Sequence, residues 1–200
     1  KKKKKIRKKR VSPILITKTV RSQLINAGLH IGDHRKRIMS SMNCYVIGNR
    51  HSVSMIDLVG SIYYLRRGLI NIGHVVKNKM PILCVLSRNE GKDYLSLNLE
   101  KIGHYGIKGR YIPGTISNYR SVNLMKELPG VVCIADTKDG GHAIKECMNL
   151  ELPYFGLCDS DMEPSWFCYP VFGNNDSVEG SRLLVYLVYT TIELQERRLR

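Results

Sequence analysis

Several kinds of sequence element are missing from this chain of 200 residues. Its longest apolar stretch, residues 183–192, is about half as long as a membrane-spanning helix must be. The apolar run after the first ten residues contains Ser12 and Pro13 and is too short for the core of a signal peptide. Neither a G-x-x-x-x-G-K-S/T nor a G-x-G-x-x-G motif is present. We therefore expect neither a membrane-spanning protein nor an enzyme with the usual loops for nucleotide phosphates.

The six cysteines contain no C-x-x-C pair, which argues against a zinc ribbon and against a redox motif. Cys84, Cys133 and Cys158 lie inside apolar runs, where cysteine acts as a small hydrophobic residue. We expect six free thiols and a reducing compartment within a cell or an organelle.

Acidic residues are scarce, since 17 Asp and Glu stand against 32 Lys and Arg, which gives a net charge of +15. Such a balance favours a polyanionic partner, either nucleic acid or an anionic membrane surface. Nine of the cations fall within residues 1–10, which contain no acid. A run of like charges repels itself, so we expect a disordered basic tail over residues 1–12, followed by one α/β domain over residues 13–200.

The cations of the tail are predicted to bind RNA, because contact with phosphates releases condensed counterions. A solvated tail without a partner is the alternative. The residues concerned are Lys1, Lys2, Lys3, Lys4, Lys5, Arg7, Lys8, Lys9 and Arg10.

The first third of the domain is expected to hold a short helix capped by Thr17 and then two short strands. These strands, residues 45–47 and 53–56, are predicted to flank a turn at residues 48–50. Asp57 is expected to cap a long helix, because apolar residues follow it at helical spacing.

Three apolar runs then predict strands that are buried on both faces, at residues 82–86, 131–135 and 154–158. Helical segments alternate with them, near residues 90–102, 141–150 and 177–199. This alternation predicts a doubly wound α/β domain with a parallel sheet.

Two basic segments of the domain predict contacts with RNA. In the first, glycines at 28 and 32 allow a close approach of the backbone to phosphates. Its candidate residues are His30, His34, Arg35, Lys36 and Arg37. A metal site at His30 and His34 is the alternative, but Gly32 disfavours a helix between them and no third ligand lies nearby in the sequence, so no metal is expected.

The second basic segment, residues 108–120, contains no acid and interleaves cations with tyrosines, hydroxyls and an amide. Arg and Lys suit phosphates, Tyr suits stacking on bases, and hydroxyl and amide groups suit the 2′-OH and phosphate oxygens. A position in the core is the alternative for the tyrosines, above all for Tyr111. The candidates are Lys108, Arg110, Tyr111, Thr115, Ser117, Asn118, Tyr119 and Arg120.

Asp136 and Asp159 follow two of the predicted strands. Ligands of doubly wound sheets bind at the carboxyl ends of the strands, so an enzyme that uses these two carboxylates is the competing function. Both residues suit turns and caps equally well, and we prefer that interpretation. A third class, an independent binder of RNA or of an anionic surface, also fits the charge.

Four stretches, in order, resemble the S2 family of small-subunit ribosomal proteins over about residues 17–192. Ala27-Gly-Leu-His-Ile-Gly32 is similar to the family's A-G-V-H-F-G-H. Tyr45-Val-Ile-Gly-Asn-Arg50 with Ile56-Asp-Leu58 resembles Y-I-F/Y-G-x-R … I-D-L. Arg110-Tyr-Ile-Pro-Gly-Thr-Ile-Ser-Asn118 resembles R-W/F-x-G/P-G-T-L/F-T-N, and Leu152-Pro with Tyr169-Pro-Val-Phe-Gly-Asn-Asn-Asp176 resembles I-P … Y-P-I-P-G-N-D-D.

The resemblance implies a flavodoxin-like parallel sheet flanked by helices. It implies a structural protein and not an enzyme, with no cofactor, no small-molecule substrate and no membrane partner. Its implied partners are neighbouring ribosomal proteins and the small-subunit ribosomal RNA, bound between head and body near the messenger exit. The residues that the motifs mark as RNA-facing are His30, Arg50, Arg110, Thr115 and Asn118.

The chain also departs from the family pattern. Asp33 replaces the second His of the first motif, and Phe172 replaces a Pro of the last. Only residues 120–127 separate the third motif from the next strand, so the helical hairpin (a coiled coil) that bacterial members insert there is expected to be absent. The shortened middle and the Lys-rich, Tyr-rich composition favour a mitochondrial member acting in the matrix; a chloroplast or cytoplasmic ribosome is the alternative.

Overall fold

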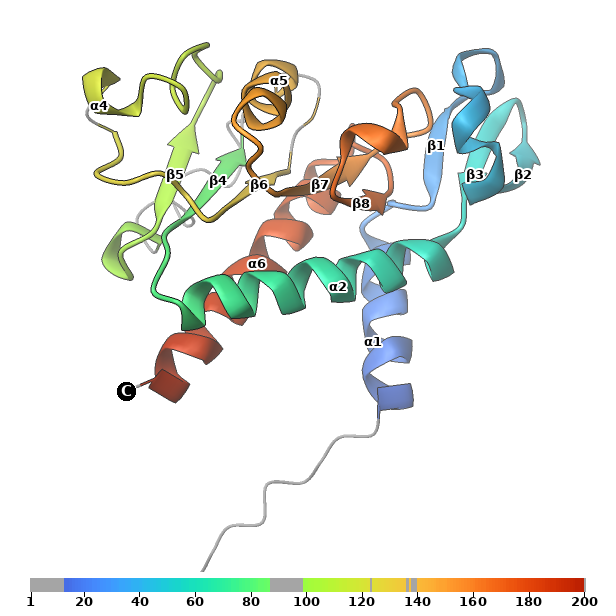
Figure 1. Cartoon of the computed structure of the whole chain (residues 1–200). Helices are drawn as coiled ribbons and strands as arrows, with labels where there is room; N and C mark the ends of the chain where they lie inside the picture. The colour runs from blue at the N-terminus through green and yellow to red at the C-terminus, as the bar shows by residue number, and fades with distance from the viewer. Residues whose placement is uncertain (1–12, 87–98, 123, 136, 138–139, 200) are drawn as a thin grey trace, which may run out of the picture.

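The computed structural model of the chain describes residues 13–86, 99–122, 124–135, 137 and 140–199 (Figure 1). The side chains of residues 13–19 and of Lys108 lie outside this description. The predicted basic tail and Asp136 also fall outside the described residues, so what was expected of them stays a prediction.

A parallel sheet of five strands forms the centre of the domain (Figure 1). The strands follow the order β5-β4-β6-β7-β8, so the second strand in the chain lies outside the first and the later strands extend to the other side. This is the flavodoxin-like order, and the predicted fold class is confirmed. The strands are β4 (Ile82–Leu86), β5 (Tyr105–Lys108), β6 (Val131–Ile134), β7 (Tyr154–Cys158) and β8 (Tyr169–Phe172).

The three predicted strands are the central ones, β4, β6 and β7, and every residue in them is buried. The two edge strands were not predicted, for different physical reasons. β5 has four residues and includes Gly106, which weakens the strand pattern. β8 contains Pro170, which lacks an N–H and is tolerated in sheets at an edge, where β8 lies.

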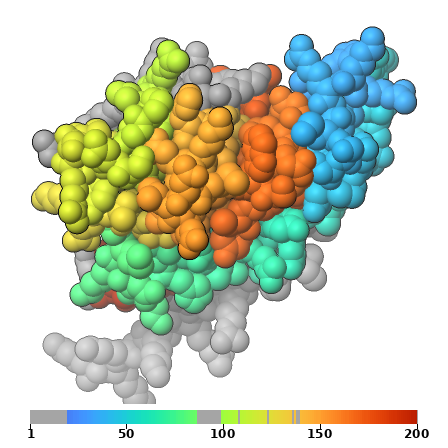
Figure 2. All heavy atoms as spheres, turned by 45° about the horizontal axis from the view of Figure 1, so that its top comes forward, coloured from blue at the N-terminus to red at the C-terminus, as the bar shows by residue number. Residues whose placement is uncertain are grey.

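A small antiparallel sheet stands at one end of the molecule, beyond β8 (Figures 1 and 2). It contains β1 (Ile31–His34), β2 (Val46–Arg50) and β3 (Val53–Ile56), in the order β1-β3-β2. Two 3-10 helices, η1 (Arg35–Arg37) and η2 (Ser40–Tyr45), connect β1 to β2.

The predicted turn at residues 48–50 is wrong. These residues belong to β2, and the turn between β2 and β3 falls at His51 and Ser52, whose φ values are +48° and +67°. Two successive residues with positive φ make the kind of turn whose twist matches a β-hairpin. Gly48, which suggested the turn, lies instead where the register of the β2–β3 pair shifts.

Three long helices cover one face of the central sheet: α1 (Pro13–Asn26), α2 (Leu58–Lys77) and α6 (Val178–Leu199). Asp57 caps α2 as predicted, because its carboxylate accepts a hydrogen bond from the Val59 N–H (2.8 Å). Thr17 is not a cap, since α1 begins at Pro13, and proline suits the first turn of a helix. α5 (Gly141–Asn149) lies on the other face of the sheet, and the short α4 (Tyr119–Val122) follows the loop after β5.

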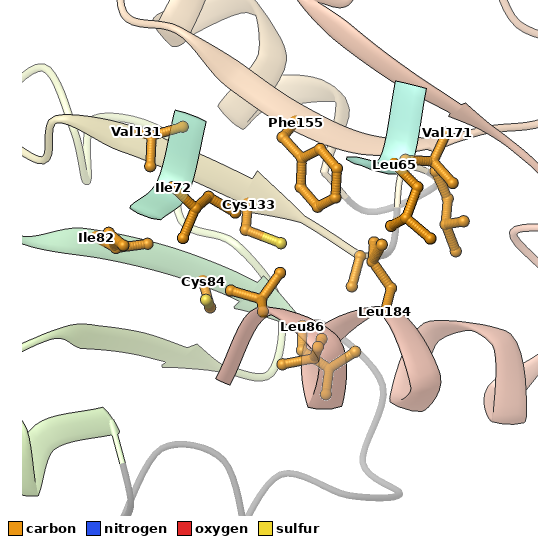
Figure 3. Close-up of a cluster of buried hydrophobic side chains, with 14 of the residues drawn as sticks. Leu65, Ile72, Ile82, Cys84, Leu86, Val131, Cys133, Phe155, Val171 and Leu184 are labelled. Carbon is orange, nitrogen blue, oxygen red and sulfur yellow. The ribbon is translucent and has the colours of Figure 1, made fainter. Parts of the chain in front are cut away.

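Each face of the sheet has its own hydrophobic core. Figure 3 shows the first, where Leu65 and Ile72 of α2 and Leu184 of α6 pack on Cys84 and Phe155 of the sheet. The second core lies under α5 and the loop of residues 110–118. Because side chains alternate along each strand, both cores draw on the same central strands.

All six cysteines are free, as the sequence predicts. Four of them are buried in the cores, and Cys44 and Cys168 are exposed. Among the described residues, no helix has both the length and the apolar character needed to cross a membrane.

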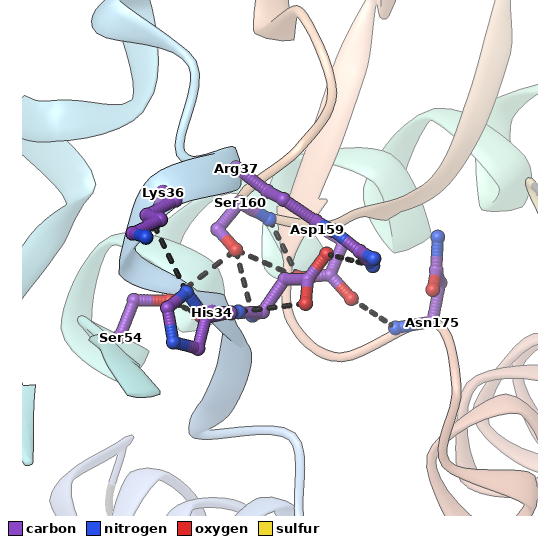
Figure 4. Close-up of polar contacts among 8 residues, drawn as sticks. His34, Lys36, Arg37, Ser54, Asp159, Ser160 and Asn175 are labelled. Atoms are coloured by element: carbon purple, nitrogen blue, oxygen red, sulfur yellow. Dashed lines mark hydrogen bonds and ion pairs between the residues drawn. The ribbon is translucent and has the colours of Figure 1, made fainter. Parts of the chain in front are cut away.

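A buried hydrogen-bond network joins the small sheet to the central sheet (Figure 4). Asp159, which follows β7, is only 3% exposed. Its carboxylate accepts hydrogen bonds from the Ser160 N–H (2.6 Å) and the Asn175 N–H (3.0 Å). Burial raises the pKa of Asp159; the N–H donors of Asn175 and Ser160 lower it by less, so the pKa stays above its usual range.

Ser160 extends this network to the small sheet. Its hydroxyl oxygen accepts a hydrogen bond from the Asp33 N–H (2.8 Å) and lies 3.2 Å from the Ser54 hydroxyl. Its carbonyl accepts from the Met39 N–H (2.9 Å). Residues 33, 39 and 54 belong to or adjoin the small sheet, so the segment after β7 sets the position of that sheet.

The close contact of α2 with β7 gives a first prediction. A Cβ atom at Gly68 would come closer than 3.0 Å to the Phe155 ring, whereas one at Gly60, on the same helix, would lie 3.8 Å from Tyr45. Gly68→Ala should lower the free energy of unfolding by about 1–3 kcal/mol, because the core is overpacked. Gly60→Ala should leave it unchanged or raise it by up to about 1 kcal/mol, because Ala favours helix. Urea denaturation measures both; a Gly68→Ala protein as stable as wild type would contradict the described packing.

The network around Asp159 gives a second prediction. Asp159→Ala leaves the buried N–H groups of Ser160 and Asn175 without an acceptor, which should lower the free energy of unfolding by roughly 2–4 kcal/mol. Asp161→Ala removes a carboxylate two residues away that is exposed, and should change it by about 0.5 kcal/mol or less. Thermal and urea unfolding of the two variants would decide, and equal stability of the pair would be the contrary result.

Candidate nucleic-acid interface

The first group of exposed cations lies on the small sheet. The Arg35 N–H donates to the Ser52 carbonyl (2.9 Å), and His34 pairs in register with Val53. These contacts bring η1 beside the tip of the β2–β3 hairpin, although 15 residues of chain separate Arg35 from Arg50. We call the resulting patch the hairpin surface; its members, all exposed, are His34, Arg35, Lys36, Arg37 and Arg50.

The hairpin surface leaves most of its cationic groups free. Arg37 pairs with Asp33 (3.4 Å), but its side chain is 73% exposed, and such a surface ion pair is weak. Among the described residues, no acid pairs with Arg35 or Arg50. The His34 Nδ1 accepts a hydrogen bond from the Lys36 N–H (3.3 Å), so the neutral ring carries its proton on Nε2, which can donate outward.

His30 is not part of this patch. It is half-buried, and its carbonyl accepts a hydrogen bond from the Ile56 N–H (3.0 Å), which anchors the start of β1. Its Nδ1 atom is buried and has no partner among the described residues. Within the same residues, no group of three or more His, Cys, Asp or Glu could hold a metal ion.

The second group of exposed polar side chains follows β5. We call it the loop surface; it contains the exposed Arg110, Ser117, Asn118 and Arg120 with the half-buried Tyr119. The Arg120 guanidinium lies 5.7 Å from the centre of the Tyr119 ring and donates to its hydroxyl oxygen (3.2 Å). The backbone of Lys108 ends β5 opposite Leu86, at the start of this loop.

Two residues predicted to bind RNA point into the protein instead. Tyr111 is 1% exposed and packs in the second core, so the expectation that it stacks on a base is wrong and the core alternative holds. Burial is the largest cause of a strongly raised Tyr111 pKa. Thr115 is 4% exposed, and its hydroxyl donates to the Ile112 carbonyl within the loop. Ile112, which the sequence did not mark, is 68% exposed.

A carboxylate that the sequence analysis missed lies beneath the loop surface. Glu146 of α5 accepts hydrogen bonds from the backbone N–H groups of Gly114 (2.6 Å), Ile116 (3.1 Å) and Ser117 (3.0 Å), and from the Ser117 hydroxyl (2.8 Å). Burial raises the pKa of Glu146, but the N–H donors of Ser117 and Gly114 together lower it further, so the pKa lies below its usual range. A signal was present, because Glu146 is the acid beside the buried Cys147 on the apolar side of α5.

The two surfaces lie at opposite ends of the same edge of the molecule, where the parallel strands end. The loop surface follows β5, an edge strand, and the hairpin surface stands beyond β8, the other edge strand (Figure 1). Figure 2 shows α5 and the segment after β7 between them. Among the described residues, that middle region carries Asp161 and Glu163 as well as the exposed Lys145 of α5, so its charge is mixed, whereas the two patches are basic.

The competing carboxylate site finds no support in Asp159. Both of its oxygens accept hydrogen bonds from neighbouring protein groups, as a turn-forming residue does. Its proposed companion, Asp136, lies outside the described residues.

The chain is similar to known ribosomal proteins. The family model for Ribosomal protein S2 matches residues 24–124 and 120–194. The small ribosomal subunit protein uS2 of Gluconobacter oxydans (strain 621H) is 26% identical over 209 aligned residues, which cover 83% of this chain and 79% of that protein. The uS2 protein of Granulibacter bethesdensis is 24% identical, with 85% and 83% covered, and that of Caulobacter vibrioides (strain NA1000 / CB15N) is 23% identical, with 83% and 78% covered.

The alignments also locate the shortened region. The alignment to the Gluconobacter protein is longer than this whole chain, although 83% of the chain takes part, so that relative has residues that this chain lacks. The two parts of the family match meet at residues 120–124, which is where the inserted hairpin was expected to be missing. Together these two parts span most of the domain, and the chain therefore belongs to the ribosomal protein S2 family.

Proposed function

We propose that this protein binds small-subunit ribosomal RNA through the hairpin surface and the loop surface together. The coarser role follows from its family, whose members are structural proteins of the small ribosomal subunit and not enzymes. The contacts with RNA are our inference from the positions and the chemistry of the exposed side chains.

One observation carries the proposal: both patches of exposed cations lie at the edge of the molecule where the parallel strands end. Arg35, Arg50 and Arg110 are exposed and have no acidic partner among the described residues. The planar guanidinium group of arginine can donate two parallel hydrogen bonds to one phosphate, which the ammonium group of lysine cannot do. Asn118 adds an exposed amide that suits phosphate and 2′-OH oxygens, and the Ser117 hydroxyl, which donates its proton to Glu146, can still accept a hydrogen bond from a 2′-OH.

The carboxylates of the middle region favour a contact at two points. RNA phosphates laid flat across the molecule would meet Asp161 and Glu163 between the patches. Two RNA segments, or one that bends away from the middle, would gain both contacts without that repulsion. The basic tail, residues 1–10, is proposed as a third contact.

We place the protein between the head and the body of the small subunit, beside neighbouring ribosomal proteins. The missing insertion and the Lys-rich composition favour a mitochondrial ribosome in the matrix, with a chloroplast or cytoplasmic ribosome as the alternative. Cross-linking within purified small subunits tests the position, and fractionation of cells tests the compartment.

The salt dependence of RNA binding tests the tail. Affinity for structured RNA should fall steeply with salt, because each neutralised phosphate adds about 0.9 to the slope of log K against log salt for a duplex and about 0.7 for a single strand. Deletion of residues 1–10 removes nine cations and should reduce this slope by several units. An unchanged slope after the deletion would remove the tail from the interface.

Single arginine variants test the two surfaces. Arg50→Ala and Arg110→Ala should each weaken RNA binding by on the order of 1–3 kcal/mol, the cost of a lost charged hydrogen bond. Their free energies of unfolding should change by about 0.5 kcal/mol or less, because both side chains are exposed. Arg66→Ala is the matched control, since it removes the same charge from an exposed position on α2, beneath the other face of the sheet.

The three variants should be compared by RNA binding and by competition with wild type for incorporation into small subunits. Equal losses for Arg66→Ala and the two surface variants would mean that net charge alone binds RNA. Full incorporation of Arg110→Ala would take the loop surface out of the interface. A large fall in the melting temperature of the Arg110→Ala protein would mean that Arg110 stabilises the fold and does not serve RNA binding alone.

A further inference from the structure

The loop of residues 110–118 has few interactions of its own that fix its shape. Its underside is anchored, because Tyr111 and Ile116 are buried in the second core. Within the loop, the backbone adds hydrogen bonds from the Thr115 N–H to the Ile112 carbonyl (3.2 Å) and from the Asn118 N–H to the Gly114 carbonyl (2.8 Å). Gly114 has a φ of +91°, a region that costs glycine little and that leaves this position free to take other conformations.

Most of the remaining hydrogen-bonding capacity of the loop is met by one side chain from another element. The Glu146 carboxylate, about 30 residues further along the chain, takes four hydrogen bonds from Gly114, Ile116 and Ser117. Without it, three adjacent backbone N–H groups would have no acceptor in the protein. Such a set of donors turned toward one carboxylate fixes the direction of the peptide planes, and therefore the directions in which Arg110 and Asn118 leave the loop.

The position of this acid is unexpected for a surface that binds a polyanion. A carboxylate beneath the loop surface repels phosphates, and it reduces the net positive charge there by one. The presence of Glu146 is explained if RNA affinity gains more from the fixed conformation of the loop than it loses through the negative charge. A loop that is already fixed loses less conformational entropy when it binds.

The geometry points to Glu146 as the positioning residue of the loop surface: an acid that does not touch RNA, but on which the RNA affinity of this loop depends. The inference rests on the proposed function of the loop surface. From charge alone, removal of a negative charge from a phosphate-binding patch should strengthen RNA binding. The positioning role of Glu146 predicts the opposite, that RNA binding becomes weaker.

Glu146→Gln is the decisive variant. The amide keeps the size of the side chain, but its NH2 group replaces one of the two oxygens that accept N–H donors. The hydrogen bonds to at least one of these two oxygens are therefore lost. We expect RNA affinity at fixed salt to fall about tenfold, as for other losses of preorganisation. We also expect the amide protons of Gly114, Ile116 and Ser117 to exchange with solvent faster than in wild type.

Asp161→Asn is the matched control. It removes the same charge from an exposed position in the region between the two surfaces. It should leave RNA affinity unchanged or raise it slightly, and it should not alter exchange at the three loop amides. Glu146→Asp is the second variant in case Glu146→Gln unfolds; it keeps the charge, but its shorter side chain cannot reach all of the donors, so affinity should again fall.

The outcomes separate the two proposals. If Arg110→Ala binds RNA as wild type does, the proposed function of the loop surface fails, whatever Glu146 does. If Arg110→Ala weakens binding while folded Glu146→Gln and Glu146→Asp bind as tightly as wild type or more tightly, the positioning role is overturned. Tighter binding by Glu146→Gln would show that the carboxylate occupies a phosphate site that RNA can use once it is empty.

Discussion

The buried carboxylate of Asp159 holds the two sheets of this protein in one arrangement. The small sheet and the segment between β1 and β2 also make hydrophobic contacts with the rest of the domain, through Ile56, Met42 and Tyr45, whose ring stacks on Phe172 of β8. The position of the small sheet is set by Ser160, which Asp159 orients and which bonds to the backbone at residues 33 and 39. Hydrogen bonds have directions whereas apolar contacts do not, so this network fixes the angle at which the hairpin surface is presented. The position of the hairpin surface relative to the central sheet depends on it.

A carboxylate that accepts hydrogen bonds from backbone N–H groups occurs at two places in this protein. In a chain with net charge +15, two of the 17 acidic residues, Asp159 and Glu146, use their carboxylates to collect backbone N–H groups from a distant segment. Glu146 bonds directly to the segment that carries the loop surface, whereas Asp159 acts on the hairpin surface through Ser160, whose hydroxyl accepts a hydrogen bond from the Asp33 N–H. Arginine and lysine cannot perform this task, since they only donate hydrogen bonds. A strongly basic RNA-binding protein therefore still needs a few buried or half-buried acids, and their loss would disturb the cations that they support.

The sequence predicts best the parts of the fold that depend on local pattern. β4, β6 and β7 are continuous apolar runs, and Asp57 is a cap directly before a helical pattern. The sequence analysis missed β5, β8 and the hairpin turn. Their residues have a low intrinsic preference for these conformations, which the surrounding structure stabilises. In the candidate site, the sequence identified the exposed arginines, but it also predicted RNA contacts for Tyr111 and Thr115, which are buried, and it did not mark the exposed Ile112. The pattern of α5 marks Glu146 as an acid beside the buried Cys147, but its partners lie about 30 residues earlier in the chain, and no local pattern identifies them.

The length of chain between the partners of the Asp159 network has a consequence for synthesis. Asp33 and Ser160 are 127 residues apart, and the Ser41–Glu163 hydrogen bond spans 122. While the nascent chain emerges, β1 to β3 can form a hairpin early, but they have nothing to dock against until residues 159–163 are available. The basic segments at the beginning of the chain are thus exposed to cellular polyanions before their final geometry exists. An assembly factor or the ribosomal RNA itself would find them in an undocked form during that interval, so order of synthesis and order of assembly are linked through one aspartate.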